Sequence, residues 1–288
     1  MNTDIISRGL YGVRVTGLAD ESSLAPVPSA WPAWHVVAEQ DLDLDVDRTE
    51  SVGPDAAFIR FGDGSTAEAW REDAGGRLRL NLVRDVGGNN LAHPFLAPVG
   101  MLSAYWGDRL PLHAASFGLD GRAWLLAAGK EGGKSTTLAM LELAGYPALA
   151  DDLTVIDSNL AVHRGPRLID LRQDAANALG VGESVGKIGI RERWRYRIGD
   201  CPLTLPLGGI VIPSWGEPDV ELIVGSERLP TLGQSLALRI PGSWAELLMD
   251  IALSVPVLRW KRPRELRTSR QLLDQLLDAV RAVELADQ

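Results

Sequence analysis

The chain lacks several features that would place it at once in a common class. It has one cysteine, Cys201, in 288 residues, so it can form neither an internal disulfide nor a multi-cysteine metal site. His35, His93 and His163 show no metal-ligand spacing, and no structural metal is predicted. No apolar run reaches the roughly 20 residues that span a bilayer, and no basic-then-apolar leader opens the sequence. These absences predict a cytoplasmic protein that does not bind membranes.

Positive charge is scarce as well. Lysine and arginine number 29 against 38 aspartate and glutamate residues, which gives a net charge of −9 and argues against a nucleic-acid partner. Tandem repeats and long low-complexity tracts are absent. What remains is the composition of a globular protein, 45% hydrophobic and 23% charged, long enough for one large domain or two modest ones.

The composition and the apolar pattern of the chain change near residue 95. Residues 1–95 are rich in Gly, Pro and Asp, and the segments at 56–61 and 77–83 alternate apolar and polar positions, as half-buried strands do. This pattern predicts an N-terminal, mostly antiparallel β-rich domain over 1–95. Residues 96–288 form the second predicted domain.

The second part reads as an α/β unit. Residues 112–129 predict a strand, a tight Asp-Gly turn and a strand, and residues 134–145 predict a helix that ends at a glycine. A loop and a further strand follow at 147–157. This order is typical of an α/β core, and later amphipathic helices at 243–253 and 269–283 are expected to pack on its sheet.

The segment "AAGKEGGKST", residues 127–136, has the pattern of a phosphate-binding loop. Such a loop places backbone N–H groups and a helix N-terminus against phosphates, with Lys on the β/γ-phosphates and Ser or Thr on magnesium. Two positions depart from the pattern. Ala128 replaces the first glycine, and Glu131 stands where glycine is common, so its carboxylate must turn away from the phosphates. The structural alternative is a Gly-rich turn without a ligand. The predicted nucleotide-binding residues are Gly129, Lys130, Glu131, Gly132, Gly133, Lys134, Ser135 and Thr136.

Asp151 and Asp152 come after Ser135 in the sequence, at a separation that corresponds to about one helix and a loop. On adjacent strands, these carboxylates would approach the γ-phosphate, one as a base for a hydroxyl and the other as a magnesium ligand. The residues alone do not decide which is which, and a surface cap is the structural alternative. His113 precedes the first strand of the hairpin, and a lone histidine is more often a structural hydrogen-bonding residue.

Taken together, His113-Ala114, Gly129 to Ser135 and Ala150-Asp151-Asp152 resemble the core of the HPr kinase/phosphorylase family over residues 110–160. The resemblance implies a phosphoenolpyruvate-carboxykinase-like version of the P-loop fold. It also implies transfer of the ATP γ-phosphoryl group to a serine, with Asp151 or Asp152 as base and His113 beside them. Magnesium would bind Ser135 and Asp152.

The layout is most similar to HPr-kinase-like enzymes that modify ribosomal peptides, as in lasso-peptide maturation. An acidic residue near Asp174 assists magnesium in the wider family, although a surface helix acid is the alternative here. The alternating arginines of 191–197 predict phosphate contacts from Arg193 and Arg195, or else a solvated strand face.

The sequence thus predicts an α/β P-loop kinase core with an N-terminal β-rich unit, using ATP and Mg²⁺ on a precursor peptide. A small hydroxylated substrate and a nucleotide-binding scaffold without turnover are the alternatives. Nucleotide preference and assembly into a homo-oligomer stay open.

Overall fold

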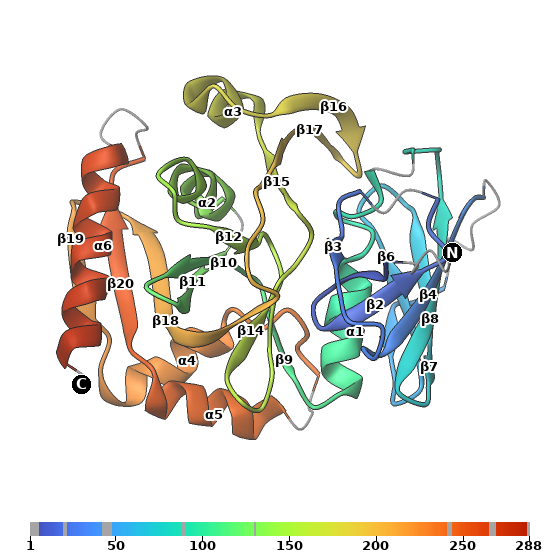
Figure 1. Ribbon diagram of the computed structural model, residues 1–288, viewed down its shortest axis with the longest axis horizontal. Helices are drawn as coiled ribbons and strands as arrows, with labels where there is room; N and C mark the ends of the chain where they lie inside the picture. Colours follow the sequence, from blue (N-terminus) through green and yellow to red (C-terminus); the bar gives the residue numbers. More distant parts are fainter. Residues whose placement is uncertain are drawn as a thin grey trace.

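The computed structural model describes residues 6–19, 22–41, 48–87, 90–129, 131–240, 244–264 and 269–286, which form a mixed α/β protein. Two large sheets lie at opposite sides of the molecule, with helix α1 between them and a small third sheet above (Figure 1). None of the described helices is both long enough and apolar enough to cross a membrane.

Eight strands from the N-terminal part form one sheet in the order β3-β1-β2-β4-β8-β7-β6-β5. Most neighbours are antiparallel as expected, but β4 runs parallel to both β2 and β8. The division of the chain near residue 95 stays a prediction. The strands are β1 Arg8–Leu10, β2 Val13–Thr16, β3 Ala25–Pro26, β4 Ala33–Gln40, β5 Ser51–Val52, β6 Ala56–Arg60, β7 Thr66–Glu72 and β8 Gly75–Leu82.

The second sheet has nine strands and holds the predicted hairpin, which turns at Asp120 and Gly121. The path is β12-β10-β11-β18-β14-β13-β9, and β20 pairs with β18 and β19. Its strands are β9 Leu110–Leu112, β10 Ala114–Leu119, β11 Arg122–Ala127, β12 Ala148–Ala150, β13 Thr154–Ile156, β14 Ala161–His163, β18 Thr204–Trp215, β19 Asp219–Leu222 and β20 Val257–Arg262.

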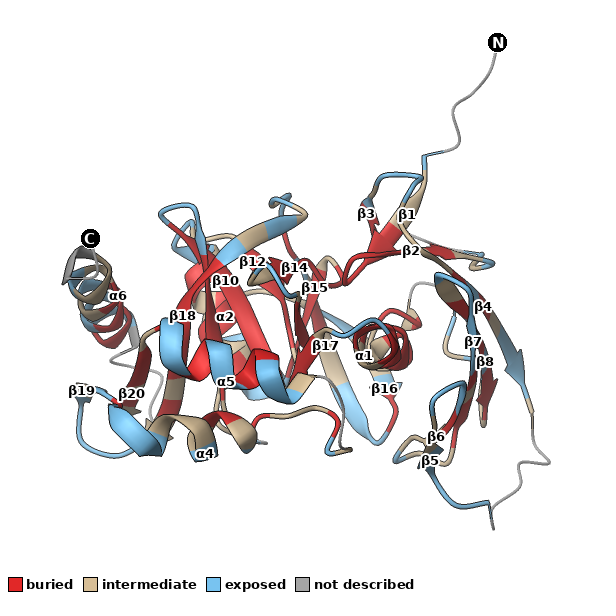
Figure 2. Cartoon of the chain, turned by 90° about the horizontal axis from the view of Figure 1, so that it is seen from below, coloured by how far each residue is buried: buried red, intermediate tan, exposed pale blue. Residues whose placement is uncertain are grey.

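Helices cover both faces of this sheet, which explains why β11 is apolar at consecutive positions (Figure 2). Trp124 and Leu126 pack with helices α2 and α6, whereas Leu125 packs with α5 on the other face. The helices are α1 Ala97–Trp106, α2 Lys134–Leu143, α3 Gln173–Leu179, α4 Arg228–Gly233, α5 Trp244–Ser254 and α6 Ser269–Ala286.

The third sheet, in the order β15-β17-β16, stands beside α2 and carries α3 at its end (Figure 1). Its strands are antiparallel, β15 Leu168–Leu171, β17 Arg191–Arg197 and β16 Glu183–Ile188. Asp170 and Arg195 are directly opposite each other on β15 and β17.

The β1–β2 turn joins the two large sheets. The Tyr11 N–H donates a hydrogen bond to the Arg164 carbonyl at 2.6 Å, and the aromatic ring of Tyr11 is buried. The ring fits because two neighbours are glycines: a Cβ on Gly100 or Gly165 would lie 2.3 or 2.9 Å from it. One apolar cluster consequently runs from the N-terminal sheet through α1 to Val155 of the second sheet.

Candidate active site

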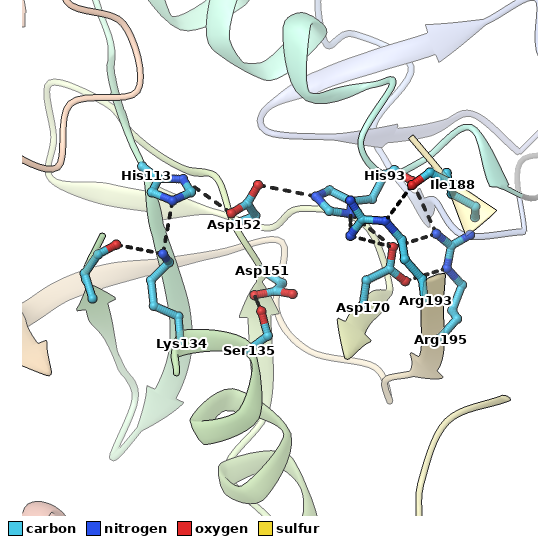
Figure 3. A network of polar contacts seen from close by, with 11 residues as sticks. His93, His113, Lys134, Ser135, Asp151, Asp152, Asp170, Ile188, Arg193 and Arg195 are labelled. Atoms are coloured by element: carbon cyan, nitrogen blue, oxygen red, sulfur yellow. Dashed lines mark hydrogen bonds and ion pairs between the residues drawn. The ribbon is translucent and has the colours of Figure 1, made fainter. Parts of the chain in front are cut away.

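Three segments that are distant in sequence meet at one edge of the nine-stranded sheet. Strand β10 is antiparallel to both β11 and β12, so its first end lies beside their last ends. This topology places His113, which precedes β10, beside the loop after β11 and the Asp151-Asp152 pair after β12 (Figure 3). The expected adjacency of β11 and β12 is wrong, because β10 lies between them.

The loop between β11 and α2 has two residues with positive φ just before the helix begins. Glu131 and Gly133 adopt left-handed conformations, with φ of 66° and 76°, and Gly133 begins α2 without any side-chain cap. The first N–H groups of α2 therefore have no intrahelical acceptor and face the loop. Gly133 has no room for a side chain, since a Cβ would lie 2.6 Å from the Arg262 guanidinium.

Lys134 is buried and folds back over this loop. Its Nζ donates to the Ala128 carbonyl at 2.7 Å and reaches the Gly129 carbonyl at 3.4 Å and His113 Nε2 at 3.1 Å. Burial lowers the pKa of Lys134, and the charges of Asp152 and Asp151 oppose that shift. The residue is a cation held in a low-dielectric position beside the start of a helix, where an anion is favoured.

The two neighbouring aspartates have different surroundings. Asp151 is buried, 8% exposed, and accepts a hydrogen bond from Ser135 Oγ at 2.9 Å. Burial, followed by the charge of Asp152, raises the pKa of Asp151 to about 6. The Asp152 side chain is 45% exposed and turns to two histidines instead. The residue has a φ of 67°, a conformation that is strained for a side chain other than glycine.

Asp152 lies between His113 and His93. Its carboxylate is 3.3 Å from His113 Nδ1 and 3.4 Å from His93 Nε2. Because Lys134 donates to His113 Nε2, the consistent tautomer of His113 carries its proton on Nδ1, facing Asp152. Burial opposes ionisation of Asp152, but the hydrogen bond and charge of His93, with His113 and Lys134, hold its pKa well below its usual range.

A buried cluster stands behind His93. Asp170 has no exposed side-chain surface, and it accepts from His93 Nδ1 at 3.0 Å and from both Arg195 Nε and Nη2, at 2.8 and 2.9 Å. Arg193 Nη1 lies 3.7 Å from the same carboxylate, and its Nε donates to the Ile188 carbonyl. Burial alone would lower the pKa of His93, but its bonds to Asp152 and Asp170 raise it to about 9.

This cluster corrects the prediction for two arginines. Arg193 and Arg195 were expected to contact phosphate, but the structure engages both with Asp170 and His93, away from the loop after β11 (Figure 3). Arg195 is buried and also donates to the Asn90 side chain. The two central arginines of β17 thus belong to an ion-pair cluster, whereas Arg191 and Arg197 are exposed.

The predicted magnesium ligands do not all gather. Ser135 bonds Asp151 instead of Asp152, and Asp174 is exposed in α3, where it accepts the Ala175 N–H. In the described part of the chain, no hydrogen bond or ion pair joins Asp174 to the aspartate pair. Nor do the described His, Cys, Asp and Glu side chains include a group of three arranged to hold a metal.

The other loop residues are placed as follows. Glu131 turns away, as its charge requires, and pairs with Arg172 at 2.7 Å and Arg264 at 3.9 Å. Thr136 is partly buried in the first turn of α2. Lys130 lies outside the described residues.

Sequence reasoning missed His93, Asp170, Tyr11 and Arg262. Asp170 carried a usable signal, since a carboxylate within the apolar run Leu168–Leu171 is seldom buried without a cationic partner. His93 carried none, because its partners lie 59 and 77 residues away.

Comparison with known proteins gives a remote structural likeness and no match in sequence. No family model and no curated protein matches the chain. Among solved structures, the HPr(Ser) kinase/phosphatase from Coxiella burnetii aligns with a TM-score of 0.34 and 10% identity, over 62% of this chain and 94% of that one. A likeness at this level does not establish a shared family, and the resemblance of the motifs stays a prediction.

Proposed function

We propose that this protein is an ATP- and Mg²⁺-dependent kinase that transfers the γ-phosphoryl group to a hydroxyl. The observation that carries the proposal is the meeting, at one sheet edge, of an uncapped helix start with Lys134, Ser135, Asp151 and Asp152. Phosphoryl transfer depends mainly on positioning and charge stabilisation, and these side chains supply both.

The loop and the start of α2 would bind the nucleotide phosphates. The free N–H groups of the first turn and the helix dipole favour an anion there. Lys134 adds a positive charge. Its ammonium group donates hydrogen bonds to a loop carbonyl and to His113, and it can exchange these acceptors for phosphate oxygens. Glu131 does not oppose this, because Arg172 holds its carboxylate.

Magnesium fits the pair formed by Ser135 and Asp151. A hydroxyl and a carboxylate oxygen 2.9 Å apart are hard ligands of the kind that Mg²⁺ prefers, with phosphate oxygens and water completing its shell. When bound, the ion supplies charge neutralisation to the phosphates. This assignment replaces Asp152 by Asp151 as the aspartate on the metal.

Asp152 is then the general base. It is ionised, solvent-accessible and held by His113 and His93. Its carboxylate takes the proton of the acceptor hydroxyl, whose oxygen bonds to the γ-phosphorus as the bond to the β–γ bridging oxygen breaks and ADP leaves. Lys134 balances the negative charge on the transferred group.

The proposed acceptor is a serine of a ribosomal precursor peptide. Support for it comes from the resemblance of the overall layout to HPr-kinase-like enzymes that modify ribosomal peptides; a small hydroxylated molecule is the alternative acceptor. Both acceptors present an aliphatic hydroxyl, so both make the same demand on Asp152.

Calorimetry with Mg-ATP and a phosphoryl-transfer assay test the proposal. Lys134→Ala should lose nucleotide binding, because it removes the buried cation. Asp152→Asn should still bind Mg-ATP but should form ADP about 10²- to 10⁴-fold more slowly, the usual contribution of a general base. Asp219→Asn, at an exposed pair with Lys261, is the matched control and should change neither.

The outcomes separate the alternatives. Mg-ATP binding without any ADP release, with or without serine peptides and small alcohols, would favour a nucleotide-binding scaffold. If millimolar ATP or GTP does not bind the unaltered protein, the kinase proposal is refuted.

A further inference from the structure

An exposed tryptophan stands beside the phosphate loop. Trp215 ends β18, and its side chain is 41% exposed. Strands β11, β18 and β20 are parallel, so Trp215 lies at the same sheet edge as the loop after β11. The indole is close to that loop, since a Cβ on Gly133 would lie 3.2 Å from it. In open α/β sheets this edge is where ligands bind.

Arg262 fixes this ring from one side. Its guanidinium lies 4.4 Å from the centre of Trp215 and 4.7 Å from that of Trp260. It also donates to the Gly132 carbonyl at 2.9 Å and approaches Thr137 Oγ1 at 3.3 Å. Trp215 is thereby tied to the phosphate loop. The more exposed guanidinium of Arg264 also approaches the ring, 5.8 Å from its centre, and Trp215 keeps 41% of its surface open to solvent.

The charge of Arg262 has no carboxylate partner among the residues that the structure describes. Burial lowers the pKa of its guanidinium to about 10, and its Nε is buried without a hydrogen-bond partner. Arg262 is half-buried, and a cation withdrawn from water is normally paired. Beside a helix start that favours anions, this unpaired cation matches a ligand that brings both negative charge and an aromatic ring.

We propose that Trp215 is the stacking platform for the base of a purine nucleotide, held in place by Arg262 beside the phosphate loop. The inference rests on the proposed function and adds the subsite that binds the nucleoside. Aromatic stacking accepts any base, because every base has a π-face, and it favours the larger purines. ATP and GTP are therefore expected to bind with affinities within about tenfold of each other.

Titration with Mg-ATP and with magnesium tripolyphosphate, which lacks a base, tests the platform. Trp215→Ala should weaken ATP binding by about 5- to 150-fold, the worth of one stacked base, and leave tripolyphosphate binding unchanged. Trp215→Phe should restore most of the ATP affinity. Trp70→Ala is the matched control, since Trp70 is similarly exposed, at 37%, on the other large sheet.

The tripolyphosphate titration also reports whether the loop of each variant is intact. Equal ATP affinity in Trp215→Ala and the unaltered protein, with tripolyphosphate still bound, would overturn the platform and leave the phosphate site standing. Failure of the unaltered protein to bind either compound would overturn both proposals together.

Discussion

Removing the negative charge of Asp170 should destabilise the protein more than any exposed charge change. In Asp170→Asn the buried guanidinium of Arg195 loses a bidentate partner, and His93 loses its acceptor on Nδ1. The side chains of Asp170 and Arg195 are 0% and 3% exposed, so water cannot replace the lost bonds. Removal of one partner of a buried pair costs about 3–5 kcal/mol.

Urea unfolding followed by tryptophan fluorescence measures this cost. With a slope of about 3 kcal/mol/M, a loss of 3 kcal/mol moves the midpoint down by roughly 1 M. Asp219→Asn is the control, because its pair with Lys261 is exposed and is worth at most about 1 kcal/mol. A midpoint shift in Asp170→Asn no larger than that of the control would refute the inference that the cluster is a paired, desolvated unit.

The same effect has a defined pH dependence. Burial opposes ionisation of Asp170, but His93 and Arg195 hold its pKa well below its usual range. A carboxylate with a depressed native pKa stabilises the fold above its unfolded pKa of about 3.9, and the contribution is lost as the pH falls through the native value. The difference between Asp170→Asn and the unaltered protein should therefore be full near pH 6 and shrink below pH 4. The part that comes from His93, whose pKa is raised to about 9, should decline above the unfolded pKa of about 6.5.

Two further predictions concern the nucleotide site. The pKa of Asp151, raised to about 6, means that protons compete with magnesium below that pH. Mg-ATP affinity should fall about fivefold from pH 6 to pH 5, as the ionised fraction of Asp151 falls, and calorimetry of Asp151→Asn should show no such step. Gly133→Ala should lower the free energy of unfolding by about 1–3 kcal/mol and weaken nucleotide binding, since a side chain is strained at the left-handed φ of 76° and its Cβ would displace the Arg262 guanidinium. Unchanged urea midpoint and ATP affinity in Gly133→Ala would contradict the described loop.

Local parts of the site could be predicted because their elements are consecutive. The hairpin, the loop and α2 follow one another along residues 114–143, so apolar runs and glycines indicate them directly. The hydrogen bond between Ser135 and Asp151 was not predicted, because Asp152 was the expected partner on magnesium and β10 lies between β11 and β12. Their roles in binding and catalysis stay predictions.

The remaining contacts depend on how separate sheets pack. Asp170 and His93 come from different elements, and no spacing in the chain brings them together. The arginines of β17 were visible as a pattern, but their partner depended on the register that sets Arg195 opposite Asp170. Arg262 was hidden for the same reason, because its contact with Gly132 joins the end of β20 to a loop 130 residues earlier.

The turn at Tyr11 has a consequence for how the chain is made. The neighbours that enclose its ring, Gly100 and Gly165, lie about 90 and about 150 residues further along the chain. A nascent chain must carry this aromatic ring uncovered until Gly165 has been made, and contacts of such long sequence separation form slowly. Burial and the charges of Asp152 and Asp151 raise the pKa of Tyr11, so the surroundings of the aspartate pair are completed only when this late contact has formed.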